Sequence, residues 1–190
     1  MTTTSRNILL RGEGYLKEGV AGAAITPGHF IKLTTTGKYV VHSVAGGKSQ
    51  RLVALAPEWV GDNPTINTAY ALDDQVLMVA LESGSEIYAL LAANAAAIVV
   101  GNLVECAADG TVRKLTELTA LIAASGTSDG TVADVGAAFN QTTLNNNFQD
   151  IATQLNLLTA YASKNAIGVA LENVDNSAVG ATARLRIAII

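Results

Sequence analysis

The chain has 190 residues and a formal net charge of −4; 49% of its residues are hydrophobic and only 5% are aromatic. This length suffices for one well-cored domain with a smaller appendage and is too short for two full-sized enzymatic domains. The longest nearly unbroken apolar run, Ala89 to Val100, falls far short of the ~20 residues that a membrane helix needs, so we expect no membrane partner. The mean hydropathy of +0.33 is high for a soluble monomer and indicates buried contacts between subunits.

Basic and acidic residues are unevenly distributed. Residues 1–60 carry seven Lys or Arg and three acids, whereas residues 61–163 carry two basic residues and eleven acids. An ordinary solvated surface accounts for most of these charges. Alternatively, the basic N-terminal part docks on an acidic partner, with Arg6, Arg11 and Lys17 as the candidate binding residues. We expect that partner to be a protein and not nucleic acid, because the basic residues are scattered singly, without aromatic residues between them.

The N-terminal residues 1–14 are predicted to form an arm. Met1 to Asn7 shows no basic stretch followed by an apolar one, so we expect no secretory signal and a chain that stays where it is made or leaves inside a larger particle. The arm is polar or threonine-rich until Ile8, and we expect it to become ordered only on a partner. The alternative is that Asn7 to Leu10 pairs at the edge of a sheet.

From residue 15 onward, short strand patterns alternate with turn signals. Thr26-Pro27-Gly28 has proline and glycine in the order that a type II turn needs, and Asp109-Gly110 predicts a hairpin. Two of the strands, Arg51 to Ala56 and Gln75 to Leu81, are apolar on both faces, as expected for strands covered on both sides. The other predicted strands are Phe30–Leu33, Tyr39–His42, Glu86–Leu90, Leu103–Cys106, Thr111–Arg113, Ile167–Leu171 and Arg184–Ile190. In the last of them, Leu185, Ile187 and Ile189 should face the core.

Residues 115–164 break the strand pattern and are predicted to be a helical insertion. Large apolar residues recur there 4, 3, 4 and 3 positions apart, which would place one narrow apolar stripe on a helix. The stripe consists of Leu144, Phe148, Ile151, Leu155 and Leu158. It could be the seam of a homotrimer or pack on the chain's own sheet.

The predicted fold class is therefore mainly β: a small antiparallel β-sandwich or barrel with an inserted α-helical segment near the C-terminus. The expected organisation is an arm over residues 1–14, a β domain over 15–114 and 165–190, and the insertion over 115–164.

No residue pattern predicts a catalytic, metal or cofactor site, and we expect a protein that is not an enzyme. Cys106 is the only cysteine and is expected to be a small buried hydrophobe. His29 and His42 lack acids at metal-site or relay spacing and are expected to be satisfied surface residues. Asp73 and Asp74 are adjacent, so in a strand their side chains would point to opposite faces.

The order of glycine turns and apolar strands resembles that of the capsid cement, or decoration, proteins of tailed bacteriophages. The resemblance covers most of residues 15–112 and 165–190. The segments that carry it are Val20–Phe30, Leu52–Ala56, Tyr70 with Asp73–Val76, Ala92–Gly101 before Leu103, Ile167–Asp175 and Arg184–Ile187. Asp134 to Asn156 resembles a helical trimerising piece of phage structural and head-fibre proteins.

This resemblance implies a small β domain on the outside of a virion, assembled in the host cytoplasm. Such proteins commonly bind as homotrimers and clamp neighbouring copies of the major capsid protein. The chain departs from the plain pattern through residues 115–163. The alternative function is a head-fibre or tail adaptor that binds a host surface or a further fibre through this insertion.

Overall fold

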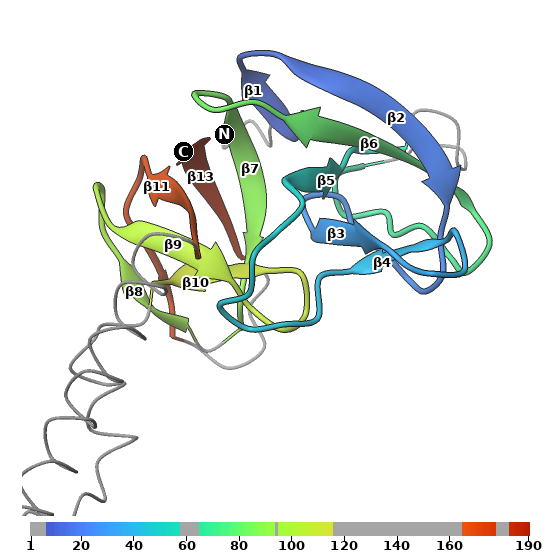
Figure 1. Ribbon diagram of the computed structural model, residues 1–190. Helices are drawn as coiled ribbons and strands as arrows, with labels where there is room; N and C mark the ends of the chain where they lie inside the picture. Colours follow the sequence, from blue (N-terminus) through green and yellow to red (C-terminus); the bar gives the residue numbers. More distant parts are fainter. Residues whose placement is uncertain (1–6, 58–64, 94, 116–164, 178–182) are drawn as a thin grey trace, which may run out of the picture. The chain divides into compact units, whose positions relative to one another are not determined.

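The computed structural model describes residues 7–57, 65–93, 95–115, 165–177 and 183–190. The chain divides into two units, residues 1–115 with 165–190 and residues 116–164, and all described residues belong to the first. They form strands joined by turns and loops (Figure 1). The strands are β1 (Leu9–Arg11), β2 (Gly14–Val20), β3 (Phe30–Leu33), β4 (Tyr39–Val41), β5 (Leu52–Ala54), β6 (Gln75–Leu81), β7 (Glu86–Leu91), β8 (Ala95–Ile98), β9 (Leu103–Cys106), β10 (Val112–Lys114), β11 (Ala166–Ala170), β12 (Val174–Asn176) and β13 (Ala183–Ile189).

Five strands close into a small barrel in the order β7-β10-β9-β11-β13, and β13 pairs back onto β7. The β7–β13 pair is the longest of these, running from Ala183 opposite Leu91 to Ala188 opposite Glu86. Among the pairings of these five strands, β10 with β7 is parallel and the others are antiparallel. β1 adds to β7 as an outer strand, with Leu9 opposite Ile87. Closure leaves the five strands without a free edge, which removes the usual site of unwanted strand pairing.

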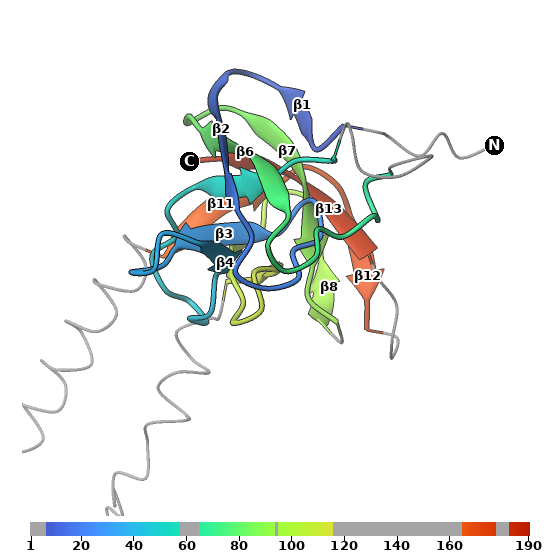
Figure 2. The ribbon, with the colours of Figure 1, turned by 90° about the vertical axis from the view of Figure 1, so that its right-hand side faces the viewer.

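The second sheet has the order β2-β6-β5-β3-β4 and is antiparallel throughout. It curls until the end of β2 reaches β4, where Ala21 forms a bridge to Tyr39 and the Gly22 N–H donates to the Tyr39 carbonyl at 2.7 Å. A separate pair, β8 with β12, lies beside the barrel (Figure 2).

Two apolar clusters form the core, and the second sheet lies between them. The larger one fills the barrel and includes Phe30, Val53 and Val79 from the second sheet. The smaller one lies on the opposite face of that sheet. Its members are Ala21, Ile25, Ile31, Leu52, Ala54, Tyr70, Val76 and Met78. Because β5 and β6 contribute alternate residues to the two clusters, the prediction that both strands are covered on both faces is confirmed.

Several local predictions are confirmed. β9 pairs with β10 across Asp109-Gly110, and Gly110 has a φ of +78°, which favours glycine. The Thr26–His29 turn is closed by the His29 N–H donating to the Thr26 carbonyl at 3.1 Å, with Gly28 at a φ of +89°. The inward residues of β13, Leu185, Ile187 and Ile189, are buried as expected.

The predicted fold class is wrong in its helical part. The structure is mainly β, but none of its described residues lies in a helix, and none could cross a membrane as one. The prediction rested on apolar spacing and on the resemblance to a helical trimerising piece. Neither fixes a helix, because isolated helices are marginal in water and asparagine and glycine disfavour them. The stripe residues Leu144, Phe148, Ile151, Leu155 and Leu158 lie outside the described part of the chain.

The expectation of an arm that orders only on a partner is also wrong for Ile8 to Arg11; residues 1–6 lie outside the described part of the chain. Ile8 is 2% exposed and belongs to the larger cluster, and its carbonyl accepts from the Tyr88 N–H at 2.8 Å. The alternative expectation, that this segment pairs at the edge of a sheet, is confirmed: Leu9–Arg11 forms β1, which pairs with β7. A three-residue apolar run is too short to show an alternation, so its burial could not be read from spacing.

Candidate functional site

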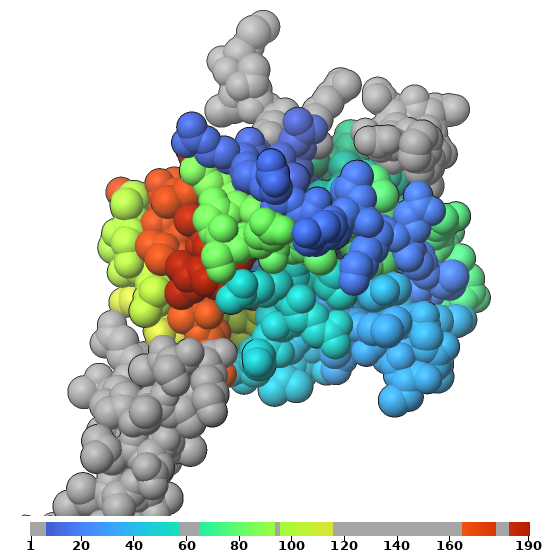
Figure 3. All heavy atoms as spheres, turned by 45° about the horizontal axis from the view of Figure 1, so that its top comes forward, coloured from blue at the N-terminus to red at the C-terminus, as the bar shows by residue number. Residues whose placement is uncertain are grey.

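The predicted binding residues fall on the first two strands. Arg11 ends β1 with a side chain that is 79% exposed and lies 3.9 Å from the Glu86 carboxylate. Lys17 is at the middle of β2 and is exposed. Arg6 lies outside the described residues. Figure 3 shows the N-terminal strands, in blue, spread over one face of the molecule. Arg11 and Lys17 are therefore both exposed, on two strands that follow each other in the chain.

A fixed corner joins β1 to β2. Gly12 has a φ of +94°, and a Cβ added there would lie 2.8 Å from the Cα of Ser85. The Ser85 hydroxyl donates to the Glu13 carbonyl at 2.8 Å. Glycine at this position lets the chain pass close to the turn between β6 and β7, which sets the direction in which β2 leaves the barrel.

β2 has one paired edge and one open edge. All seven of its residues pair with β6, from Gly14 opposite Leu81 to Val20 opposite Gln75. No other strand among the described residues pairs with it. Ala21, just after the strand, turns its N–H toward the Asp74 carbonyl. Because backbone groups alternate along a strand, those of Leu16, Glu18 and Val20 point to the open edge.

Two large apolar side chains are exposed on this strand. Tyr15 is 69% exposed and Leu16 is 67% exposed. As neighbours in a strand they project from opposite faces, Tyr15 on the face of Ala80 and Leu16 on the face of Val79, their β6 partners. A long exposed strand with apolar side chains is the type of edge that takes up a strand from another chain, unless charge or coverage prevents it. We name the open edge of β2, with Arg11, Tyr15, Leu16 and Lys17, the β2 edge surface.

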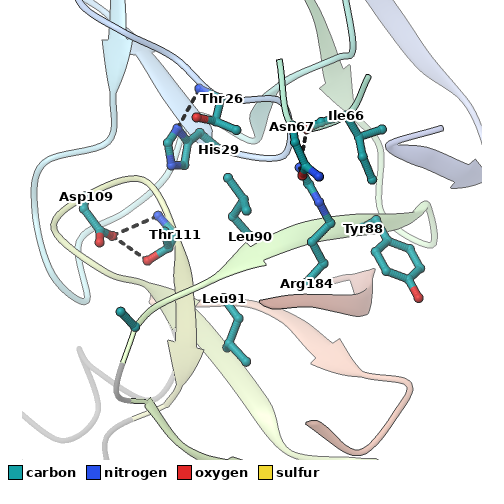
Figure 4. Close-up of a pocket in the computed structure, with 11 residues that line it drawn as sticks. Thr26, His29, Ile66, Asn67, Tyr88, Leu90, Leu91, Asp109, Thr111 and Arg184 are labelled. Carbon is teal, nitrogen blue, oxygen red and sulfur yellow. Dashed lines mark hydrogen bonds between the residues drawn. The ribbon is translucent and has the colours of Figure 1, made fainter. Parts of the chain in front are cut away.

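A pocket of about 770 Å³ opens between the barrel and the loops that lead to the second sheet (Figure 4). One side is formed by the turn at Thr26 to His29 and by the hairpin at Asp109 to Thr111. Leu90 and Leu91 of β7 also line it; the Leu90 side chain lies on the side of His29, and the Leu91 side chain lies on the other side of the strand. Its further lining residues are Ile66, Asn67, Tyr88, Ala93 and Arg184.

Arg184 and His29 are the basic side chains of this pocket. The Arg184 guanidinium donates to the Pro27 carbonyl at 2.8 Å, to the Ile66 carbonyl and to Asn67 Oδ1 at 3.2 Å. Burial lowers its pKa, although a guanidinium stays charged in proteins. Burial also lowers the pKa of His29; the Asp109 carboxylate raises this pKa and Arg184 lowers it further. His29 is therefore neutral near pH 7.

The remaining candidate groups have structural surroundings. Cys106 is buried as predicted, and burial raises the pKa of its thiol to about 12, so it is no nucleophile near pH 7. His42 is buried, against the expectation of a surface position, and its Nε2 lies 2.9 Å from the Val44 carbonyl. Asp73 and Asp74 lie in a turn: Asp73 pairs with Lys38 at 2.5 Å, whereas Asp74 accepts from the Ala71 N–H at 2.7 Å.

Within the described ranges, no three His, Cys, Asp or Glu side chains come together in a way that could hold a metal ion. A scan against protein-family models finds no match, and no curated protein sequence matches the chain.

Sequence reasoning selected Arg11 and Lys17 but missed the apolar part of the β2 edge surface. Tyr15 and Leu16 are adjacent and are followed by Lys17 and Glu18, so the segment shows no apolar alternation. The available signal was glycine near both ends of the segment, at Gly12, Gly14 and Gly19. Glycine allows the backbone to lie close to neighbouring residues, here Ser85 at one end and Tyr39 at the other. The pocket had no such signal, because Arg184 is 157 residues from its partner Pro27.

Proposed function

We propose that the chain is a capsid decoration protein that docks on the major capsid protein at the outside of a tailed-phage virion and acts there by binding, not by catalysis. The resemblance of its turn and strand order to phage cement proteins supports this reading. The alternative is an adaptor that binds through residues 115–164, which lie outside the described part of the chain except for Leu115.

The observation that carries the proposal is the open edge of β2. A partner strand that adds to this edge would satisfy the backbone groups of Leu16, Glu18 and Val20 while covering Tyr15 and Leu16. Backbone pairing supplies affinity with little demand on partner sequence. Arg11 at the end of β1 and Lys17 on β2 carry exposed charges, which would attract an acidic partner.

Such docking would stabilise a shell by mass action. A ligand that binds the assembled shell and not its separated subunits shifts the equilibrium toward the assembled form. Packaged DNA pushes the junctions between subunits apart, and a decoration protein that bridges them opposes this. We propose a homotrimer, because three linked copies of one modest contact bind far more tightly than a single copy.

The test is cosedimentation of the purified chain with heads assembled from the major capsid protein encoded in the same genome. Burying a leucine contributes about 1.5–3 kcal/mol. Leu16→Asp should therefore weaken binding by about 10- to 100-fold. Val100→Asp is the matched control: Val100 is 59% exposed and lies between β8 and β9, outside the β2 edge surface.

A second pair of variants separates backbone pairing from side-chain contact. Glu18→Pro removes an N–H on the open edge without removing a hydrogen bond to β6, since proline is tolerated where the N–H faces solvent. Glu18→Ala controls for the lost carboxylate, which accepts from Gln75 Nε2 at 2.5 Å. Weaker binding for Glu18→Pro alone supports strand addition. Wild-type binding by Leu16→Asp and Glu18→Pro would overturn the assignment of this surface, and no binding by the wild type would overturn the function.

A further inference from the structure

The Arg184 side chain is a cation held by neutral groups. All three of its hydrogen-bond acceptors are uncharged: the carbonyls of Pro27 and Ile66 and the side-chain oxygen of Asn67. No carboxylate of the described residues lies within 4.0 Å of the guanidinium, whereas Arg186, on the same strand, pairs with Glu86 at 2.5 Å. The pocket thus contains a guanidinium that forms no direct ion pair with a carboxylate of the described residues.

The position of this guanidinium is fixed while part of its donor capacity is unused. A guanidinium can donate five hydrogen bonds, and Arg184 makes three. One ties β13 to the loop at Pro27, and two tie it to the loop at Ile66–Asn67, which lies beside Arg184 in Figure 4. A Cβ on Gly28 would lie 2.5 Å from Arg184 Nη1, so the glycine leaves room for the side chain. Arg184 is therefore held in place before any ligand arrives, which lowers the entropy cost of binding.

His29 adds a second donor to the same pocket. Its Nδ1 accepts from the Thr26 N–H at 3.1 Å, so the proton of the neutral ring is on Nε2. Leu90 of β7 provides an apolar side chain beside His29, whereas Leu91 projects from the other side of the strand into the larger cluster (Figure 4). Asp109 is the pocket's carboxylate; its Oδ1 accepts from the N–H and the hydroxyl of Thr111, and it is exposed. Its charge opposes a ligand that carries two negative charges.

We propose that this pocket binds a monocarboxylate with a compact apolar body, whose carboxylate pairs with Arg184 and whose body lies against Leu90. The volume of about 770 Å³ lies within the range of small-molecule sites. Arginine recognises planar carboxylates, and a half-buried pair is stronger than an exposed one. Asp109 selects against phosphate dianions. This site is independent of the β2 edge surface and of the proposed capsid role.

The test is an NMR titration of the isotopically labelled full chain with 3-phenylpropanoate, with 3-phenylpropanamide and phenyl phosphate as comparison probes. We expect saturable shifts at the amides of His29, Leu90 and Arg184 with the carboxylate. Hydrogen bonds to charged groups predict an affinity at least about tenfold higher than for the amide. Phenyl phosphate should bind more weakly than the carboxylate.

Two variants test whether Arg184 is the residue that pairs with the carboxylate of the ligand. Arg184→Gln should remove the preference for the carboxylate over the amide, whereas Arg186→Gln, two residues along the same strand, should keep it. Equal affinity for carboxylate and amide in the wild type would overturn the proposal, and this comparison does not depend on whether Arg184→Gln folds. Absence of saturable shifts, tighter binding of phenyl phosphate, or an unchanged preference in a folded Arg184→Gln would each overturn it as well.

Discussion

Gly19 of β2 lies directly against the ring of Tyr39 on β4, so closely that a Cβ on Gly19 would be 2.2 Å from Cε2 of the tyrosine. These residues belong to the two outer strands of the second sheet, which meet where Ala21 bridges to Tyr39. The contact closes the curled sheet at one end of β2 and leaves the rest of that strand with an open edge. The sheet can curl in this way because Gly19 has no side chain that would collide with the ring of Tyr39.

Gly19→Ala should destabilise the protein, because the added methyl group meets the ring of Tyr39. Overpacking of this kind typically costs about 1–3 kcal/mol. The measurement is chemical unfolding of the single variants and of Gly19→Ala combined with Tyr39→Ala, in which the room is restored. A double variant no more stable than the sum of the single effects would show that the two residues are not coupled.

Ile8→Ala should destabilise the isolated chain, since this side chain is buried in the larger cluster although it lies near the N-terminus. Losing a buried isoleucine typically costs about 2–5 kcal/mol. Arg11→Ala is the control, because its side chain is largely exposed and should change the free energy of unfolding little. Equal unfolding midpoints for wild type and Ile8→Ala would mean that the segment does not belong to the core in solution.

Charge should contribute to docking through Arg11 and Lys17. Reversal of both to glutamate should lower occupancy on capsids, and the loss should shrink as salt rises, because exposed charges are screened beyond about 8–10 Å at physiological ionic strength. Adding the Arg6 reversal tests the third predicted residue. Occupancy that is insensitive to salt and to these reversals would indicate apolar docking and remove the charged residues from the surface.

Stability should fall on mild acidification. Burial lowers the pKa of both His29 and His42 in the folded chain, and at His42 the Val44 carbonyl opposes this shift while Lys32 adds to it. The unfolded chain therefore binds more protons below about pH 6.5, so the stability present above that pH is lost as the pH falls toward the folded-state pKa values. Urea unfolding between about pH 7.5 and pH 5.5 measures this. The combined variant His29→Gln and His42→Gln should show a weaker pH dependence of the free energy of unfolding. The same pH dependence in this variant as in the wild type would contradict the assignment of the effect to the two histidines.

The proposed homotrimer is tested by light scattering on the wild-type chain. The apolar residues selected from the sequence as its seam, Phe148 and Leu155 among them, lie outside the described part of the chain. Phe148→Asp with Leu155→Asp should yield monomers or aggregates, since burial of such side chains contributes about 1.5–3 kcal/mol each. A wild type that is monomeric at high concentration would exclude the trimer.

Local patterns predicted the parts of the fold that neighbouring residues determine. The alternation of Leu185, Ile187 and Ile189 and the turn at Asp109-Gly110 identified β13 and the β9–β10 hairpin. Two-sided burial of β5 and β6 followed from unbroken apolar runs. Closure of the barrel could not be predicted in this way, because the pairing of β13 with β7 joins residues about a hundred positions apart and neither strand encodes its partner.

The same limit applies to the sites. Basic residues near the N-terminus could be selected from charge, but Tyr15 and Leu16 become a docking candidate only because β2 lies at the edge of its sheet. Arg184 becomes a candidate binding residue only through Ile66 and Pro27, which are 118 and 157 residues away. Exposure of an edge and enclosure of a charge are properties of long-range packing, which a single sequence does not display.

Electron cryo-microscopy of the decorated head tests the central claim most directly. We expect β2 to lie against the shell, with an extended segment of the major capsid protein along its open edge and with Tyr15 and Leu16 covered. Density in which β2 faces solvent, while another surface of the chain contacts the shell, would contradict it.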